Sequence, residues 1–167
     1  MGIFTKHFKG QMIQSIEKER ITSALLKSIN NENPYHKVYR GGFESFSEEN
    51  KNKFDLVISN IPFGAYKVFD QEYFQDWKKN KESIRFKSCN RIHSYYFMKG
   101  TDLLNKNGIL AYITSTSIAD SKSHSELRKE LMMESELISF VRLPNNIFEG
   151  TAVNTDILIL KKRANRL

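Results

Sequence analysis

The sequence is poor in cysteine and histidine and has no long apolar run, and each scarcity excludes a class of protein. Cys89 is the single cysteine, so no internal disulfide can form, which favours a reducing, cytoplasmic location. One cysteine and four scattered histidines offer no cluster of metal ligands, so we expect no structural zinc. No apolar run approaches the roughly 20 residues that cross a bilayer, and the N-terminal residues lack the apolar region of a secretory signal. We therefore expect no association with a membrane.

Positive charge is what the sequence has in excess. Lysine and arginine outnumber aspartate and glutamate by 26 to 19 in 167 residues, which gives a net charge of +7. This balance favours a polyanionic partner, because a protein that neutralises phosphates releases their counterions. Basic and aromatic residues are interleaved between residues 74 and 91, as in a loop that stacks bases and contacts phosphates, although a solvated surface segment has the same composition. The length suits one domain, which we place at residues 1–163, with a short tail at residues 164–167.

Strand and helix patterns alternate along the chain. Short apolar runs predict strands at residues 11–16, 37–40, 54–58, 109–114, 137–143 and 155–160. Helical patterns predict helices at residues 19–29, 92–104 and 123–133, and a helical turn at residues 3–8. The polar segment from Gly64 to Asn90 is expected to be a long loop, of a kind that is usually functional or mobile. The alternation predicts a doubly wound, mostly parallel α/β sheet with right-handed crossovers.

The stretch V-I-S-N-I-P-F-G at residues 57–64 lies where one of these strands ends. Pro62 and Gly64 are ordinary turn residues, and Asn60 can cap a turn. In an open α/β sheet, however, ligands bind beside the carboxyl ends of the strands. Asn60, Pro62 and Phe63 are therefore either a plain turn or part of a binding site.

Four blocks of sequence resemble those of the adenine-N6 DNA methylases, which are S-adenosylmethionine-dependent amino-methyltransferases. Asn60-Ile61-Pro62-Phe63 resembles their Asn-Pro-Pro-aromatic motif. The other blocks are I-H-S-Y-Y-F at residues 92–97, L-L-N-K-N-G-I-L-A-Y-I-T-S at 103–115, and R-L-P-N-N-I-F-E-G-T at 142–151 with N-T-D-I-L-I-L-K-K-R at 154–163. The resemblance extends from about Gly2 to Arg163. It implies a Rossmann-like methyltransferase fold with three αβα layers and a mostly parallel sheet that has a late antiparallel strand.

The resemblance also implies a chemical role for the motif. The exocyclic amine of adenine is a poor nucleophile, and two acceptors that grip its N–H bonds would favour attack on a methyl sulfonium. By resemblance, the side-chain oxygen of Asn60 and the backbone carbonyl of Ile61 are these acceptors, and Phe63 stacks on the base. Flipping the base out of the duplex costs a few kcal/mol, and stacking returns roughly 1–3 kcal/mol. Ile61 stands where the family usually has proline, so we expect a less rigid motif.

Other residues resemble the family's cofactor site. Glu17 follows the first expected strand, as does the acidic residue that binds the ribose hydroxyls of S-adenosylmethionine, and Glu19 is its rival. Glu44 is expected to meet the cofactor adenine, with Phe46 nearby, although such a phenylalanine is more often part of the core. Gly2 is the nearest remnant of the family's glycine-rich cofactor loop.

Three more residues belong to the neighbouring blocks. His93 is expected to be structural rather than catalytic, because its helix would pack under the motif loop. Ser115 and Thr116 end a strand, where hydroxyl groups either line a target pocket or cap a loop.

The family's first strand and full glycine-rich loop have no counterpart in the sequence, and neither does a separate target-recognition domain. Two strands would then lack their shared neighbour. We expect them to pair directly, to accept a strand from a partner chain, or to cause self-association. Cofactor binding by this chain alone is correspondingly in question.

The sequence thus favours a DNA adenine-N6 methyltransferase, or a fragment of one, that uses S-adenosylmethionine within restriction-modification. Two alternatives stay open. One is a catalytically silent module that binds nucleic acid or a partner. The other is an amino-methyltransferase that acts on a protein glutamine or on RNA.

Overall fold

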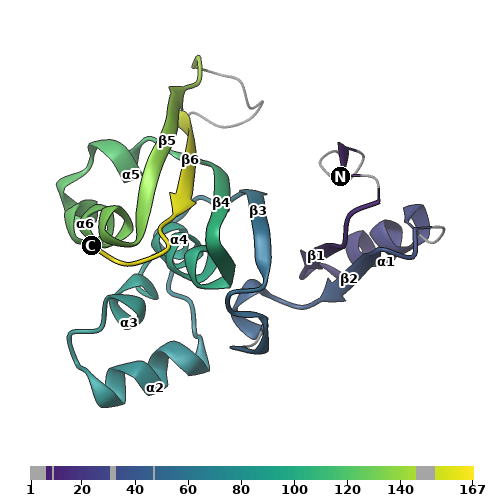
Figure 1. Ribbon diagram of the computed structural model, residues 1–167, viewed down its shortest axis with the longest axis horizontal. Helices are drawn as coiled ribbons and strands as arrows, with labels where there is room; N and C mark the ends of the chain where they lie inside the picture. Colours follow the sequence, from purple (N-terminus) through teal and green to yellow (C-terminus); the bar gives the residue numbers. More distant parts are fainter. Residues whose placement is uncertain (1–6, 9, 31–32, 47, 146–152) are drawn as a thin grey trace. The chain divides into compact units, whose positions relative to one another are not determined.

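The computed structural model describes residues 7–8, 10–30, 33–46, 48–145 and 153–167 (Figure 1). The chain divides into two compact units, Met1–Phe46 and Ser47–Leu167, and each is described by itself. Gly2 and most of the helical turn expected at residues 3–8 lie outside the described residues. The assignment of residues 1–163 to one catalytic domain stays a prediction.

The smaller unit is built on two parallel strands, β1 (Ile13–Glu17) and β2 (His36–Arg40), joined by α1 (Arg20–Ile29). Helix α1 begins after Glu19, whose carboxylate accepts hydrogen bonds from the N–H groups of Ile21 and Thr22 at 2.7 and 3.1 Å. In the strand register, Glu17 lies opposite Arg40. Both strands therefore end at the same edge, where the chain leads from β2 into the 3-10 helix η2 (Phe43–Ser45).

The larger unit contains a four-stranded sheet. Its strands are β3 (Phe54–Asn60), β4 (Leu104–Ser115), β5 (Ser135–Arg142) and β6 (Thr155–Lys162), in the order β3-β4-β6-β5. β3 and β4 are parallel, and β6 runs antiparallel to both of its neighbours. The expected late antiparallel strand is therefore confirmed. The three-layer arrangement depends on both units together and stays a prediction.

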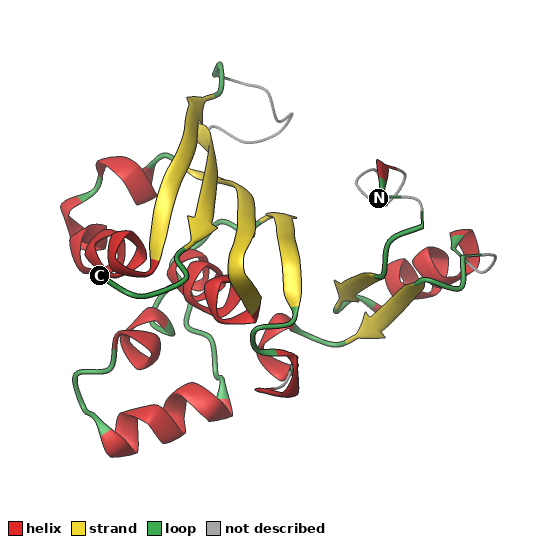
Figure 2. Ribbon diagram, viewed as in Figure 1, coloured by secondary structure: helices red, strands yellow, loops and turns green. Residues whose placement is uncertain are grey.

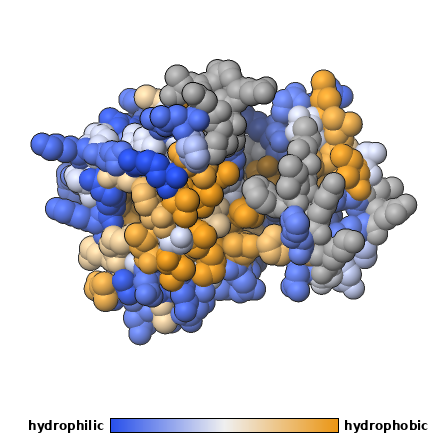
Figure 3. Space-filling view, turned by 90° about the horizontal axis from the view of Figure 1, so that it is seen from above, coloured by the Kyte–Doolittle hydropathy of each residue, from blue (hydrophilic) through white to orange (hydrophobic). Residues whose placement is uncertain are grey.

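Helices α4 (Ile92–Leu103) and α6 (Ser125–Glu134) pack against this sheet, with the short α5 (Ser117–Asp120) and η4 (Lys122–His124) before α6 (Figure 2). Alternate residues of β4 and β6 are buried, namely Leu110, Tyr112, Leu158 and Leu160. The residues between them are only half-buried and entirely aliphatic, namely Ile109, Ala111, Ile113, Ile157 and Ile159. Accordingly, Figure 3 shows hydrophobic surface gathered on this unit. One sheet face thus forms the core, and the other remains partly open in the described structure.

The prediction of a long loop from Gly64 to Asn90 is wrong, because this segment contains two helices, α2 (Gln71–Lys79) and α3 (Ile84–Ser88). The Asp70 carboxylate caps α2 by accepting hydrogen bonds from the N–H groups of Glu72 and Tyr73. Polar residues dominate the segment, but Tyr73 and Trp77 are one helical turn apart and mark one face of α2. Aromatic residues of α2 pack on Phe86 of α3. The ring centroids of Phe74 and Trp77 lie 5.1 and 5.2 Å from that of Phe86.

The other expected strands and helices are present with shifted ends. The largest shift is in β4, which begins at Leu104, whereas the sequence predicted a helix that ends at Leu104 and a strand that begins at Ile109. Asn107 adopts a φ of 65° within this strand, and the pairing with β3 shifts between Phe54 and Leu56. The short η3 (Glu48–Asn50) precedes β3. Among the described helices, none is both long and apolar enough to cross a bilayer.

Candidate functional site

Asn60 is the last residue of β3 and lies opposite Ile113 of β4 in the strand register. Because the two strands are parallel, their carboxyl ends share one edge of the sheet, where β4 ends at Ser115. The side chain of Asn60 is exposed. The motif therefore begins at the edge where ligands bind in open α/β sheets.

The side-chain amide of Asn60 forms no hydrogen bond with any described residue, so it does not cap a turn there. The backbone carbonyl of Ile61 likewise accepts no hydrogen bond within the described part of the chain. Two acceptors next to each other in sequence are thus available at this edge. The binding role of the motif stays a prediction, with which two unpaired acceptors are consistent.

Ile61 replaces the family's proline without loosening the backbone in the way we expected. Its N–H donates a hydrogen bond to the Ile113 carbonyl at 3.1 Å, which continues the β3–β4 pairing by one residue. Its side chain is 1% exposed. Proline lacks this N–H, so isoleucine holds the motif by a hydrogen bond and by burial where proline would use its ring.

The residues after Ile61 are fixed to α3 and α4 by backbone hydrogen bonds. Pro62 and Phe63 are half-buried, and Gly64 adopts a φ of 154°. Further on, the Tyr66 carbonyl accepts from the N–H of Ile92 at 3.1 Å, and the Val68 N–H donates to the Cys89 carbonyl at 2.8 Å. The motif loop (residues 60–66) is therefore tied to the sheet at one end and to the start of α4 at the other.

The Ser115 hydroxyl caps the turn after β4, whereas the Thr116 side chain makes no capping hydrogen bond. The Ser115 hydroxyl donates to the Ser117 hydroxyl at 2.9 Å and accepts from the Ser117 N–H at 3.2 Å. The Thr116 N–H donates to the Asn154 carbonyl at 3.0 Å. Of the two roles left open by the sequence, the structure favours loop capping for Ser115 and leaves both open for Thr116.

His93 is buried and pairs with His124, a residue that the sequence did not single out. Their Nε2 atoms are 2.7 Å apart. Burial, the neighbouring His124 and Arg91 lower the pKa of His93 to about 4, while the backbone of Gly64 acts in the opposite direction. Burial and Arg91 also lower the pKa of His124. Both rings are therefore neutral at neutral pH, and a lone histidine in a sequence gives no signal that could have revealed the pair.

In the smaller unit, the structure separates Glu17 from its rival Glu19. The Glu19 carboxylate is occupied by the cap of α1, whose backbone N–H groups lower its pKa. Glu17 ends β1, is half-buried, and accepts one hydrogen bond from the Glu19 N–H at 2.9 Å. Glu17 is thus the better placed of the two to bind a ligand at the strand edge.

Glu44 and Phe46 follow the same edge of the smaller unit. Glu44 forms an exposed ion pair with Lys18 at 3.2 Å, and a Cβ atom at Gly42 would collide with its carboxylate. Phe46 is buried and contacts Tyr39 edge to face, with ring centroids 5.6 Å apart. Glu44 thus lies at the edge with its carboxylate paired to Lys18, whereas Phe46 supports the alternative of a core residue.

The basic segment between residues 74 and 91 is only partly available to a polyanion. Arg85 is largely committed to Asp102 and Glu134, at 2.6 and 3.0 Å. Lys87 pairs with Glu82. The exposed cations that remain on α2 and just after it are Lys78, Lys79 and Lys81, for which no partner is found within the described part of the chain.

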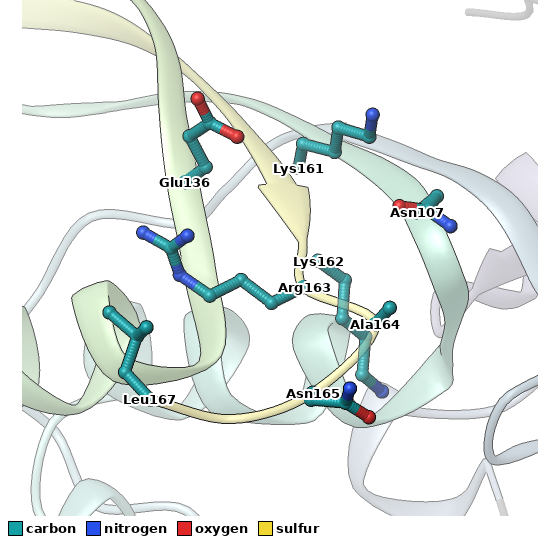
Figure 4. A pocket seen from close by; sticks show the side chains of 8 residues that line it. All are labelled: Asn107, Glu136, Lys161, Lys162, Arg163, Ala164, Asn165 and Leu167. Atoms are coloured by element: carbon teal, nitrogen blue, oxygen red, sulfur yellow. The ribbon is translucent and has the colours of Figure 1, made fainter.

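A hollow of about 310 Å³ lies at the end of β6, between Asn107, Glu136 and the C-terminal residues (Figure 4). Lys161 and Arg163 make it basic. Lys162 also lines it, but its ammonium group donates to the carbonyls of Thr101 and Leu104. Asn107 precedes Ile113 by six residues along β4, so the hollow is remote from the end of the strand where Asn60 lies. No group of three or more potential metal ligands occurs among the residues that the structure describes.

The sequence matches the Eco57I restriction-modification methylase family over residues 4–148. It is 26% identical over 125 residues to the methylase subunit of the type I restriction enzyme MpnII of Mycoplasma pneumoniae, which covers 70% of this chain and 22% of that subunit. The chain therefore spans less than a quarter of this relative.

Solved structures share the fold. The M protein of the type I restriction enzyme EcoKI matches with a TM-score of 0.71 at 17% identity, over 99% of this chain and 35% of that protein. The N-methyltransferase NodS of Bradyrhizobium japonicum, solved with S-adenosyl-L-homocysteine, matches with a TM-score of 0.60 at 10% identity, over 96% and 72% of the two chains. These likenesses establish the Rossmann-like methyltransferase fold, and the match over most of the sequence shows that the chain belongs to the Eco57I restriction-modification methylase family.

Proposed function

We propose that the chain is the catalytic part of a DNA adenine-N6 methyltransferase of a restriction-modification system. The observation that carries the proposal is a pair of acceptors at the carboxyl edge of β3, the Asn60 amide oxygen and the Ile61 carbonyl, which form no hydrogen bond with any described residue. The family to which the chain belongs supports DNA as the substrate. The excess of positive charge supports the same partner.

In this proposal, the two acceptors bind the N–H bonds of the target amine and orient its lone pair. The nitrogen forms a bond to the methyl carbon as the carbon–sulfur bond of the sulfonium breaks, and the amine then releases one proton to water. Phe63 stacks on the extruded base, which recovers part of the cost of flipping. Because positioning suffices for this reaction, the motif needs no acid or metal.

S-adenosylmethionine is the proposed methyl donor and supplies an electrophilic methyl group when bound. The donor set of the smaller unit fits it, since Glu17 presents a half-buried carboxylate at a strand end that could accept hydrogen bonds from ribose hydroxyls. Glu44 offers a second carboxylate after the same sheet edge. Gly2, the proposed remnant of the glycine-rich loop, falls outside the described residues.

We further propose that the chain works with a partner that completes its sheets. Within the described part of the smaller unit β1 pairs with β2 alone, and within that of the larger unit β3 pairs with β4 alone, so each unit has an edge strand. A strand from a second copy or from another chain would fill such an open edge. The type I M protein and methylase subunit that this chain resembles support an assembly with other chains.

The substitution Asn60→Ala tests the proposed reaction. We expect loss of methyl transfer from labelled S-adenosylmethionine to adenine-containing duplex DNA, because one of the two acceptors is removed. Circular dichroism and salt-dependent DNA binding should be unchanged, since the Asn60 side chain is exposed and forms no hydrogen bond with a described residue. Ser59→Ala, one residue earlier in β3, serves as the control. Transfer that persists in Asn60→Ala would exclude this site.

A further inference from the structure

His93 and His124 form a buried hydrogen bond, and the second hydrogen bond of His124 indicates which ring donates. His93 lies in the first turn of α4 and His124 ends η4, and their side chains are buried. The Nε2 atoms face each other at 2.7 Å, so one ring must donate and the other must accept. The rings cross at 60° with centroids 4.8 Å apart, which excludes a stacked arrangement.

A third group selects the donor. His124 Nδ1 lies 3.0 Å from the Ser117 carbonyl, which can only accept, so the His124 proton is on Nδ1. His124 Nε2 is then the acceptor, and His93 donates from its own Nε2. The Arg91 guanidinium, a donor only, lies 3.4 Å from the same His124 nitrogen and donates to the Ser123 hydroxyl at 2.7 Å.

The pair joins the two segments that form the candidate edge. His93 lies beside Gly64, the residue after the Asn60–Phe63 motif, and follows Ile92, whose N–H binds the Tyr66 carbonyl. His124 binds the Ser117 carbonyl at the start of α5, directly after β4. The path therefore runs from the motif loop through two imidazoles to the turn that ends β4.

The surroundings of the pair favour its neutral form, in which one proton lies between the two Nε2 atoms. Arg91 contacts His124 from the start of α4, and Arg128 of α6 binds the carbonyls of Ile118 and Ser121 close by. Lys87 and Glu126 line the hollow beside His124. The two arginines lower the pKa of His124, in support of a neutral pair.

We propose that His93 and His124 are positioning residues that hold the motif loop in the shape in which Asn60 and Ile61 can bind the target amine. This inference rests on the proposed function for its catalytic meaning. The rigidity of the loop, however, can be measured without cofactor or DNA.

Two substitutions at one position separate positioning from packing. His93→Phe keeps a ring of similar size and removes the donor, whereas His93→Gln keeps an N–H that can reach His124. We expect amide hydrogen exchange of residues 60–66 to accelerate about tenfold in His93→Phe, as for the loss of one buried hydrogen bond. His93→Gln should restore most of the protection. Nitrogen-15 NMR at neutral pH should show His124 protonated at Nδ1 and His93 at Nε2.

The outcomes separate this inference from the proposed function. Selective acceleration in His93→Phe, with a lower kcat and an unchanged KM for S-adenosylmethionine, supports both. The same acceleration in a chain whose wild type transfers no methyl group supports positioning and contradicts the proposed reaction. If exchange rises throughout the larger unit in both variants, or if the motif loop does not respond, the pair is merely structural and the inference is overturned.

Discussion

At the scale of single residues, Asp70 combines two roles. Its carboxylate caps α2 and also accepts hydrogen bonds from the Tyr95 hydroxyl at 2.6 Å and from the Lys99 ammonium group at 2.9 Å. The side chains of Asp70 and Lys99 are each 1% exposed. One buried ion pair thus fixes the start of α2 to α4. Because the two residues are 29 positions apart, the sequence contains no sign of their pairing.

Lys99→Met tests this ion pair. The substitution leaves the Asp70 carboxylate buried without its cation, and we expect the free energy of unfolding to fall by about 3–5 kcal/mol, measured by urea denaturation. Lys87→Met is the matched control, because its pair with Glu82 is solvent-exposed and its loss should change the stability little. Adding Asp70→Asn to Lys99→Met should recover part of the loss. A stable Lys99→Met variant would mean that the pair contributes little.

At the scale of elements, the predictability of each segment depends on where its stabilising contacts lie. β3 and its motif could be predicted, because an apolar run followed by N-I-P-F carries both the strand and its end within eight residues of sequence. Helices α2 and α3 could not be predicted from the sequence, because they are stabilised by contacts with distant segments. Asp70, Tyr73 and Arg85 bind partners on α4 and α6. A polar composition alone is typical of a loop.

Arg85→Leu tests how α3 is held. Arg85 bridges Asp102 of α4 and Glu134 of α6, and its removal leaves Asp102 with the Tyr73 hydroxyl as its hydrogen-bond donor. We expect α2 and α3 to loosen, which the fluorescence of Trp77, the single tryptophan, reports directly. Acrylamide quenching should increase and the emission should shift to the red. Arg166→Leu, which removes an exposed arginine near Glu130 and Glu134, should leave both signals unchanged.

At the scale of the whole molecule, the sequence predicted the order of the strands and the late antiparallel strand, because both follow from local patterns and resemblance, but it missed α2, α3 and α5. It left open how the strands that lack a shared neighbour would behave. The described strands form two sheets. One consists of β1 and β2, and the other has four strands with β3 at one edge. That outcome depends on which pairings are available in space, which no local pattern encodes.

An open β3 edge has a measurable consequence for assembly. The strand is apolar and Ile58 is 37% exposed, so we expect the protein to self-associate as its concentration rises in sedimentation velocity experiments. Ile58→Lys places a charge on this edge strand and should keep the protein monomeric. β5 is the opposite edge strand, and Ile138→Lys is the matched control there. Association that survives Ile58→Lys but is lost in Ile138→Lys would assign the contact to β5. If the wild-type protein is monomeric at every concentration, self-association through β3 is excluded, and only a strand from a different protein could pair with this edge.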